Sequence, residues 1–223
     1  MVNLIGINGR IGSGKDTVTK IIQYNTGKLK YAVSLETFLN SNWLINNNNS
    51  TFEIKKFAGK LKEIASILTG IPIYKFEDQE FKKTLLGEEW GLPKTNSTLN
   101  NIESFKDITF VELMSVREFL QILGTECMRN NLHSNVWVNA LFSEYNENSK
   151  WIISDMRFPN EYDSIKKHKG LLIKVNREAE IVSNHPSEGA LDHCMFDYII
   201  DNNATIEALN TEVLKILTKE KLI

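Results

Sequence analysis

The sequence predicts an α/β fold whose parallel sheet is covered by helices on both faces. Two observations carry this prediction. Short apolar, strand-forming runs alternate along the chain with stretches whose apolar residues have helical spacing. Most of the strand-like runs are also largely apolar, as expected for parallel strands that are buried on both faces. The composition agrees, because a chain of 223 residues with 42% hydrophobic and 24% charged residues is ordinary for a globular protein.

The first half of the chain is expected to begin with a strand and a helix and then to become less regular. In chain order the expected elements are a strand at 4–7, a helix at 17–24, a polar, asparagine-rich surface segment at 40–50, a short strand at 52–57, helices at 60–68 and 77–86, and a long polar loop at 93–107. The helix at 60–68 has a clear end, because Gly70 and Pro72 follow it.

The second half is expected to alternate regularly between helix and strand. The expected elements are helices at 115–131 and 135–146, a strand at 151–155, a helix at 159–169, strands at 171–175 and 196–200, and an amphipathic helix at 203–219. In the first of these helices Ser115 and Glu118 have the spacing of a capping box. Its expected apolar stripe consists of Val116, Phe119, Leu120, Leu123 and Cys127.

Residues 9 to 17 contain the phosphate-binding loop motif Gly-x-x-x-x-Gly-Lys between a strand and a helix, which is the context that the motif requires. Glycines let the backbone curl around a polyphosphate, and the positive end of the following helix points at the anion. Lys15 adds a mobile charge for the β- and γ-phosphates. A tight turn without a ligand is the alternative. The motif predicts a nucleoside triphosphate site made by Arg10, Ile11, Gly12, Ser13, Gly14, Lys15, Asp16 and Thr17.

The sequence leaves the metal ligand of this site open. A serine or threonine usually follows the lysine of the motif, but here Asp16 follows it and Thr17 comes next. Either side chain is a candidate ligand for Mg²⁺, Asp16 directly or through water. Asp155 ends an apolar strand and is expected as a second carboxylate, for the metal or for an acceptor. The alternative for Asp155 is a helix cap for the segment that follows.

Arginine is rare in this chain, with five arginines against 21 lysines. Because lysine is the default cation here, a retained arginine indicates a need for the planar fork that grips phosphate or carboxylate. A surface salt bridge is the alternative for any one of them. The arginines are Arg10, Arg117, Arg129, Arg157 and Arg177.

Charge, cysteine content and hydropathy exclude several classes of protein. A formal net charge of −2 gives no reason to expect nucleic-acid binding. Two cysteines are too few for a disulfide scaffold, which favours a reducing cytoplasm. The first strand begins at Leu4, which predicts no signal peptide, and no apolar run approaches the roughly 18 residues of a membrane span.

Over most of its length the chain resembles the bacteriophage deoxynucleoside monophosphate kinases. The motifs that carry the resemblance are Gly12-Ser-Gly-Lys-Asp-Thr17, Lys60-Leu-Lys62, Ser115-Val-Arg117 with Gln121 and Leu123-Gly-Thr125, Trp137-Val138, Asp155-Met-Arg157, the strand ending at Arg177, His185-Pro-Ser-Glu-Gly-Ala-Leu191 and Phe196-Asp-Tyr-Ile-Ile-Asp-Asn202. The resemblance implies a P-loop kinase fold similar to that of adenylate-kinase-type enzymes. It also implies ATP and Mg²⁺ as cofactors and a deoxynucleoside monophosphate as acceptor.

The resemblance implies roles for individual residues. The expected catalytic residues are Lys15, Arg117, Asp155 and Arg177. The expected acceptor-binding residues are Lys62, Arg117, Gln121, Thr125, Trp137, Asp155, Arg157 and Glu161. Among these, Arg117 is expected to hold the 5′-phosphate with Lys62 as a second cation, and Trp137 to pack against the base. Plain core filling is an equal alternative for Trp137.

The resemblance also implies how one P-loop kinase domain, residues 1–223, is organised. The core is expected at 1–39, 52–58 and 150–223, a helical acceptor-binding insertion at about 59–149, and a lid at about 177–192. The expected partners are small-molecule substrates, without nucleic acid or membrane, and a homodimer is left open. For a phage-encoded protein the expected location is the cytoplasm of the bacterial host.

Two other functions remain open from the sequence. A kinase of another phosphorylated metabolite would share the loop and the lid, but its acceptor pocket would lack an aromatic wall such as Trp137. A nucleotide-binding regulatory protein is the second alternative. Small GTPases read guanine with an Asn-Lys-x-Asp run, which does not occur in this sequence.

Overall fold

The computed structural model describes residues 2–94, 110–178 and 189–223. The chain divides into two compact units, one made of Met1–Phe57 and Val138–Ile223 and the other of Ala58–Trp137. The boundaries fall within two helices, α4 (Phe57–Thr69) and α6 (Val136–Phe142).

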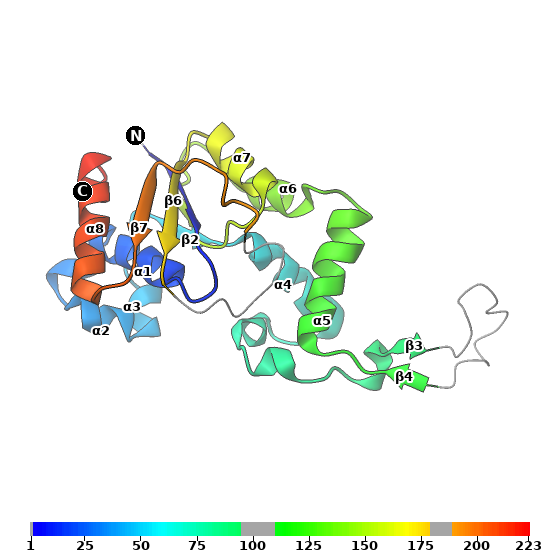
Figure 1. Ribbon diagram of the computed structural model, residues 1–223. Coiled ribbons are helices and arrows are strands. Elements are labelled where there is room, and N and C mark those ends of the chain that lie inside the picture. The colour runs from blue at the N-terminus through cyan, green and yellow to red at the C-terminus, as the bar shows by residue number, and fades with distance from the viewer. Residues whose placement is uncertain (1, 95–109, 179–188) are drawn as a thin grey trace. The chain divides into compact units, whose positions relative to one another are not determined.

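The first unit is built on a five-stranded, fully parallel sheet with the order β2-β5-β1-β6-β7. Its strands are β1 (Leu4–Asn8), β2 (Glu53–Lys55), β5 (Trp151–Ile153), β6 (Leu171–Asn176) and β7 (Tyr198–Asp201). The helices of this unit, besides part of α6, are α1 (Lys15–Thr26), η1 (Leu29–Tyr31), α2 (Leu35–Leu39), α3 (Asn42–Asn46), α7 (Pro159–Lys167) and α8 (Ile206–Lys219). The predicted α/β class with a parallel sheet is confirmed (Figure 1).

Helices cover both faces of the sheet. Successive side chains of a strand point to opposite faces, so a strand can pack against helices on both sides. Ile5 and Ile7 of β1 belong to a buried apolar cluster with residues of α1 and α8. Gly6 points the other way, where a Cβ atom would lie 2.7 Å from Cδ1 of Ile165 on α7. The central strand is therefore packed between α1 and α8 on one face and α7 on the other, as Figure 1 shows.

The second unit is mostly helical. Besides parts of α4 and α6, it contains the 3-10 turns η2 (Ile73–Glu77), η3 (Phe81–Lys83) and η4 (Glu88–Trp90), the antiparallel pair β3 (Leu92–Lys94) and β4 (Phe110–Glu112), α5 (Val116–Gln121) and the π-helix η7 (Ile122–Asn130). Its core includes Ala65 of α4, Phe76 of η2 and Phe119 of α5.

The prediction of a helix at 77–86 is wrong, because this segment forms a turn and then η3. One carboxylate oxygen of Asp78 accepts hydrogen bonds from the N–H groups of Glu80, at 2.8 Å, and Phe81, at 3.2 Å. These bonds hold the pKa of Asp78 below its ordinary value. Such local side-chain bonds compete with helical backbone bonds and favour a turn.

The helix expected at 115–131 begins as predicted but changes its winding. The capping box is confirmed: Oγ of Ser115 accepts from the N–H of Glu118 at 3.2 Å, and the Glu118 carboxylate accepts from the N–H of Ser115 at 2.7 Å. After Gln121 the chain continues as η7, in which hydrogen bonds span five residues. The wider turn rotates later residues out of the predicted apolar stripe, so Cys127 is exposed.

The remaining elements match their predictions to within a few residues, with two exceptions in detail. The segment 40–50 contains α3, and Asn48 is buried, so the segment is not entirely a surface excursion. The side chain of Asn48 donates to the carbonyl of Gln23 at 2.8 Å and accepts from the N–H of Leu29 at 3.2 Å. In the loop expected at 93–107, residues 93 and 94 belong to β3, and 95–107 lie outside the described residues.

Within the described ranges, no helix has both the length and the apolar character needed to cross a membrane.

Candidate active site

The candidate donor site lies where the parallel strands end. The phosphate-binding loop follows β1, the central strand, and Asp155, Arg177 and Asn202 follow β5, β6 and β7. Because all five strands run in the same direction, these segments share one edge of the sheet, where ligands of such sheets bind. Nδ2 of Asn8, the last residue of β1, donates to the carbonyl of Met156 at 2.9 Å, which joins the loop to the segment after β5.

The backbone of the loop depends on three glycines for different reasons. Gly12 and Gly14 have φ angles of +81° and +90°, a left-handed conformation that side chains disfavour. At Gly9 a Cβ atom would lie 2.8 Å from the carbonyl oxygen of Val175. The curled backbone is closed by a hydrogen bond of 3.1 Å from the N–H of Ser13 to the carbonyl of Arg10.

The first turn of α1 supplies the predicted charged residues. Gly14 is the N-cap, and Lys15 is the first residue of this 12-residue helix. Asp16 is exposed in the first turn, and Thr17 is half-buried. A negative side chain here also stabilises the positive end of the helix, so Asp16 has a structural role available besides metal binding. Ser13 is buried, and no partner is found among the described residues for its Oγ.

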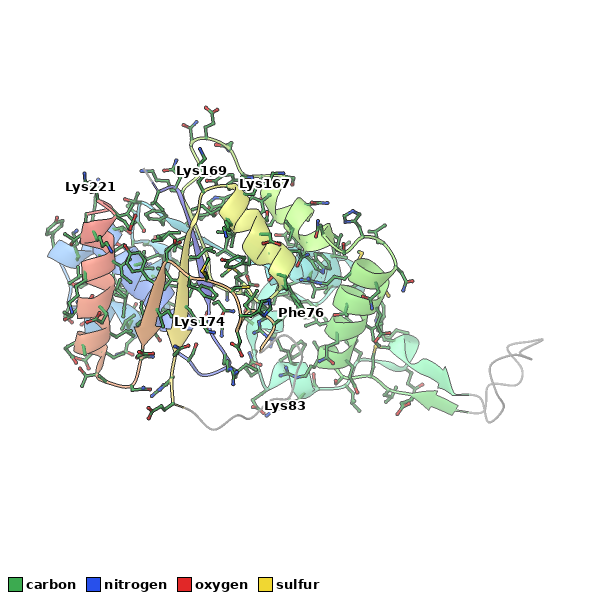
Figure 2. All side chains as sticks on the ribbon, turned by 45° about the horizontal axis from the view of Figure 1, so that its top comes forward. Phe76, Lys83, Lys167, Lys169, Lys174 and Lys221 are labelled. Atoms are coloured by element: carbon green, nitrogen blue, oxygen red, sulfur yellow. The ribbon has the colours of Figure 1, made fainter. Side chains whose placement is uncertain are left out.

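Arg10 of the loop is held by a carboxylate that sequence reasoning missed. Nη2 of Arg10 lies 2.8 Å from one oxygen of Asp192, and Nζ of Lys174 lies 2.9 Å from the other. Lys174, labelled in Figure 2, lies on β6. Hydrogen bonds from Lys174 and then from Arg10 hold the pKa of Asp192 below its ordinary value, against an opposing effect of burial.

This bridge predicts a pH-dependent contribution of Asp192 to stability. Because the pKa of Asp192 is lowered by folding, the contribution is complete above the ordinary value of 3.8 and is lost as the pH falls through the lowered pKa. Asp192→Asn is expected to lower the free energy of unfolding at pH 7 by less than about 1 kcal/mol, because the bridge is exposed. The difference from the wild type is expected to shrink as the pH falls below 3.8.

Urea unfolding of both proteins at pH 7 and pH 3 measures this difference. Asp163→Asn, on the exposed side of α7, is the matched control and is expected to leave stability unchanged at both pH values. An equal effect of Asp192→Asn at both pH values would contradict the predicted role of the carboxylate.

Asp155 and Glu161 both organise backbone near this edge. Oδ1 of Asp155 accepts from the N–H of Phe57 at 2.9 Å, so this carboxylate caps the start of α4, which is distant in sequence. Glu161 is buried, and its carboxylate accepts from the N–H groups of Arg157 at 2.8 Å and Phe158 at 3.1 Å. Glu161 thereby fixes the turn before α7, and its acceptor-binding role stays a prediction.

In the second unit, Lys62 and Arg117 reach the same irregular segment from different helices. Nζ of Lys62, which is buried on α4, lies 2.5 Å from the carboxylate of Glu77. Nη2 of Arg117 on α5 donates to Oε1 of Gln79 at 3.2 Å. The structure thus brings the two predicted phosphate ligands to neighbouring residues. The sequence did not point to Glu77 and Gln79, because both fall within the helix expected at 77–86.

The other predicted acceptor residues differ in their surroundings. Trp137 is 3% exposed, and its Nε1 donates to the carbonyl of Gly124 at 2.9 Å. This burial favours the core-filling alternative over contact with a base. Gln121 and Thr125 are exposed, at the end of α5 and within η7. Arg177 is exposed after β6, and residues 179–188 of the predicted lid lie outside the described residues, so the lid stays a prediction.

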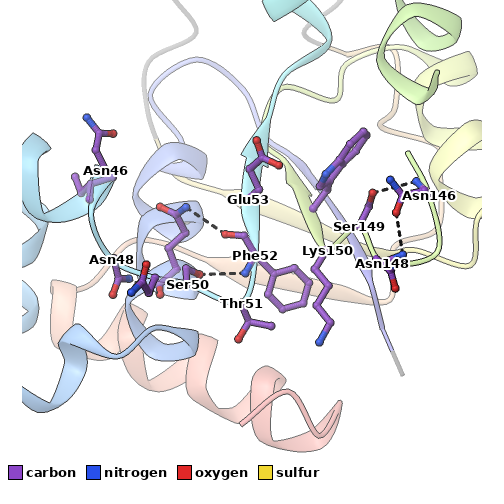
Figure 3. A pocket seen from close by; sticks show the side chains of 14 residues that line it. Asn46, Asn48, Ser50, Thr51, Phe52, Glu53, Asn146, Asn148, Ser149 and Lys150 are labelled. Atoms are coloured by element: carbon purple, nitrogen blue, oxygen red, sulfur yellow. Dashed lines mark hydrogen bonds between the residues drawn. The ribbon is translucent and has the colours of Figure 1, made fainter. Parts of the chain in front are cut away.

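A pocket of about 570 Å³ lies at the opposite edge of the sheet (Figure 3). Its polar walls include Ser50 and Thr51 before β2 and Asn148 and Lys150 before β5. It lies at the amino ends of these parallel strands, whereas the phosphate-binding loop lies at the carboxyl ends. This pocket is therefore separate from the candidate donor site.

Comparison with known proteins decides the family. The family model described as deoxynucleotide monophosphate kinase matches residues 3–213, nearly the whole chain. The chain belongs to the deoxynucleotide monophosphate kinase family. It is therefore a kinase, and the family supports a deoxynucleotide monophosphate kinase over the two alternatives, a kinase of another metabolite and a nucleotide-binding regulatory protein.

Two phage proteins illustrate the relationship. The deoxynucleoside-5′-monophosphate kinase of Escherichia phage T5 is 24% identical over 216 residues, which cover 84% of each chain. The deoxynucleotide monophosphate kinase of Enterobacteria phage T4 is 24% identical over 249 aligned positions, which cover 97% of this chain and 100% of the phage protein. The similarity thus extends over both structural units of the deoxynucleotide kinase described above.

Proposed function

We propose that this kinase transfers the γ-phosphate of ATP to a deoxynucleoside monophosphate, giving a deoxynucleoside diphosphate and ADP. The observation that carries the proposal is the phosphate-binding loop at the carboxyl edge of the parallel sheet. Its two left-handed glycines and the start of α1 are the features that let backbone N–H groups bind a polyphosphate.

On the donor side, Lys15 neutralises charge on the β- and γ-phosphates as the bond to the leaving group breaks. The loop residues 10–17 bind the triphosphate, and Asp16, Thr17 and Asp155 are the oxygen donors suited to Mg²⁺. Bound Mg²⁺ would neutralise charge on the phosphate oxygens. Arg10 and Arg177 are further cations at this edge, and Asp192 orients Arg10.

On the acceptor side, Arg117 and Lys62 bind the 5′-phosphate of the monophosphate. The partner of Arg117 is a neutral amide, that of Gln79, so a phosphate can replace it without separating an ion pair. The ion pair with Glu77 holds the ammonium group of Lys62 in position. Gln121 and Thr125 are exposed on the same helical segment and are proposed to meet the sugar or the base.

A coupled assay of ADP release tests this function. With ATP and Mg²⁺, turnover is expected with deoxynucleoside monophosphates and not without an acceptor. Ribonucleoside monophosphates assayed in parallel show whether the sugar is read. ADP release that is independent of any monophosphate would contradict the proposal, because the protein would then be a nucleotide hydrolase.

We also propose that the kinase acts in a reducing cytoplasm on small-molecule substrates. Cys127 and Cys194 are free thiols, which fits such a compartment.

A further inference from the structure

The peptide between Ser13 and Gly14 is held from outside the loop by Asn202. Nδ2 of Asn202 donates to the carbonyl of Ser13 at 2.9 Å. Asn202 directly follows β7, and its own N–H donates to the carbonyl of Asn176, the last residue of β6, at 2.8 Å. Asn202 is therefore anchored at the end of the parallel sheet, and β6 and β7 together set the position of its side-chain amide group.

Asn202 also lies against Gly14, where an added side chain would have to displace the amide group of Asn202. A Cβ atom at Gly14 would lie 2.2 Å from Nδ2 of Asn202, and Gly14 has a φ of +90°. Position 14 thus favours glycine for its conformation, and glycine there also leaves the contact with Asn202 undisturbed. This close fit indicates that the amide group and the loop form one unit.

The hydrogen bond fixes which way the peptide faces. In a planar trans peptide the carbonyl and the N–H point in opposite directions. With the Ser13 carbonyl turned to Asn202, the N–H of Gly14 points away from Asn202. Gly14 is the N-cap of α1, and its carbonyl accepts from the N–H of Val18 at 2.9 Å. The N–H of Gly14 therefore stands at the positive start of a 12-residue helix, where anions bind.

We propose that Asn202 is a positioning residue of the kinase, which locks the Ser13–Gly14 peptide so that the N–H of Gly14 is presented to the phosphates of the nucleotide. This inference rests on the proposed role of residues 9–17 as the triphosphate site. Without the lock, the peptide is free to flip and to turn a carbonyl oxygen toward the phosphates. A donor that is already oriented stabilises the phosphate charge without any reorganisation during the reaction.

The test compares ADP binding by the full-length wild type and three variants. Asn202→Ala removes the donor, and Asn202→Asp keeps the shape but replaces the donor by a carboxylate that only accepts. Asn176→Ala is the matched control, because it removes a bond of 3.2 Å from Asn176 Nδ2 to Asp201 at the end of the same two strands but leaves Ser13 untouched. Titration calorimetry gives the dissociation constants, and thermal unfolding checks that each variant is folded.

Both Asn202 variants are expected to bind ADP about tenfold more weakly or worse, equivalent to ~1.4 kcal/mol. Their KM for ATP should rise and their kcat fall, while KM for the monophosphate stays within about twofold of the wild type. In the wild type the amide resonance of Gly14 is expected to shift on ADP binding, and in Asn202→Ala this shift should be lost. Asn176→Ala should behave like the wild type.

Wild-type ADP affinity in Asn202→Asp would overturn the proposal, because Asn202 would then only fill space beside Gly14. Equal weakening in Asn176→Ala would also overturn it, since any disturbance of the strand ends would then suffice. If Asn202→Ala does not fold, Asn202→Asp carries the test, because it preserves the packing. A wild type that binds no ADP would instead refute the proposed triphosphate site itself.

Discussion

Replacing Lys15 with alanine is expected to lower kcat by about 100-fold or more while leaving the protein folded, the effect of losing one oriented charge in a closed site. Lys15 follows Gly14 at the start of α1, at the edge of the sheet where the strands end. Its charge is proposed to act on the β- and γ-phosphates, where negative charge develops during the transfer. The fold does not depend on this charge, because the buried cluster of α1 is formed by Val18, Ile21 and Ile22.

Steady-state ADP release with saturating ATP and a deoxynucleoside monophosphate measures the effect. Lys20→Ala is the matched control, because Lys20 lies on the same helix beyond the loop. The control is expected to keep kcat within about twofold, since a surface charge away from the phosphates adds little. A kcat of the wild-type value in Lys15→Ala would show that the loop does not bind the transferred phosphate.

The sequence predicts most of the sheet unit because its signals are local. Most of its strands are short apolar runs, as in Trp151-Ile-Ile, whereas β2 (Glu53–Lys55) carries two charged residues. The phosphate-binding loop is equally local, since its glycines adopt the left-handed conformations that the motif requires. The capping box of Ser115 and Glu118 also involves residues only three apart.

The parts that the sequence does not predict depend on contacts between distant residues or on small differences in winding. Asp192 is 182 residues from Arg10 in sequence, and Asn202 is 189 residues from Ser13. No local pattern marks either pair. The change from α5 to η7 leaves the apolar spacing of residues 116–123 intact, so periodicity alone does not reveal it. Trp137 shows the same limit, because the acceptor of its buried Nε1 is the carbonyl of Gly124 in another helix.

The acceptor site gives the second large expected effect, which comes from a substitution that preserves charge. Arg117→Lys is expected to weaken binding of the deoxynucleoside monophosphate by about tenfold to 100-fold, because an ammonium group does not reproduce the two parallel hydrogen bonds of a guanidinium fork. Arg117 is exposed on α5 and held by the neutral amide of Gln79, an arrangement that leaves its fork accessible to a phosphate.

The affinity for ATP is expected to change by less than about twofold in Arg117→Lys, since the donor phosphates are assigned to residues 10–17. KM for both substrates and direct titration with the monophosphate and with ADP separate the two sites. Arg129→Lys, in the π-helix that follows α5, is the matched control and is expected to leave both affinities unchanged. Weaker ADP binding together with unchanged monophosphate binding in Arg117→Lys would assign Arg117 to the donor. Unchanged affinities for both substrates would show that Arg117 contacts only Gln79 and does not belong to the acceptor site.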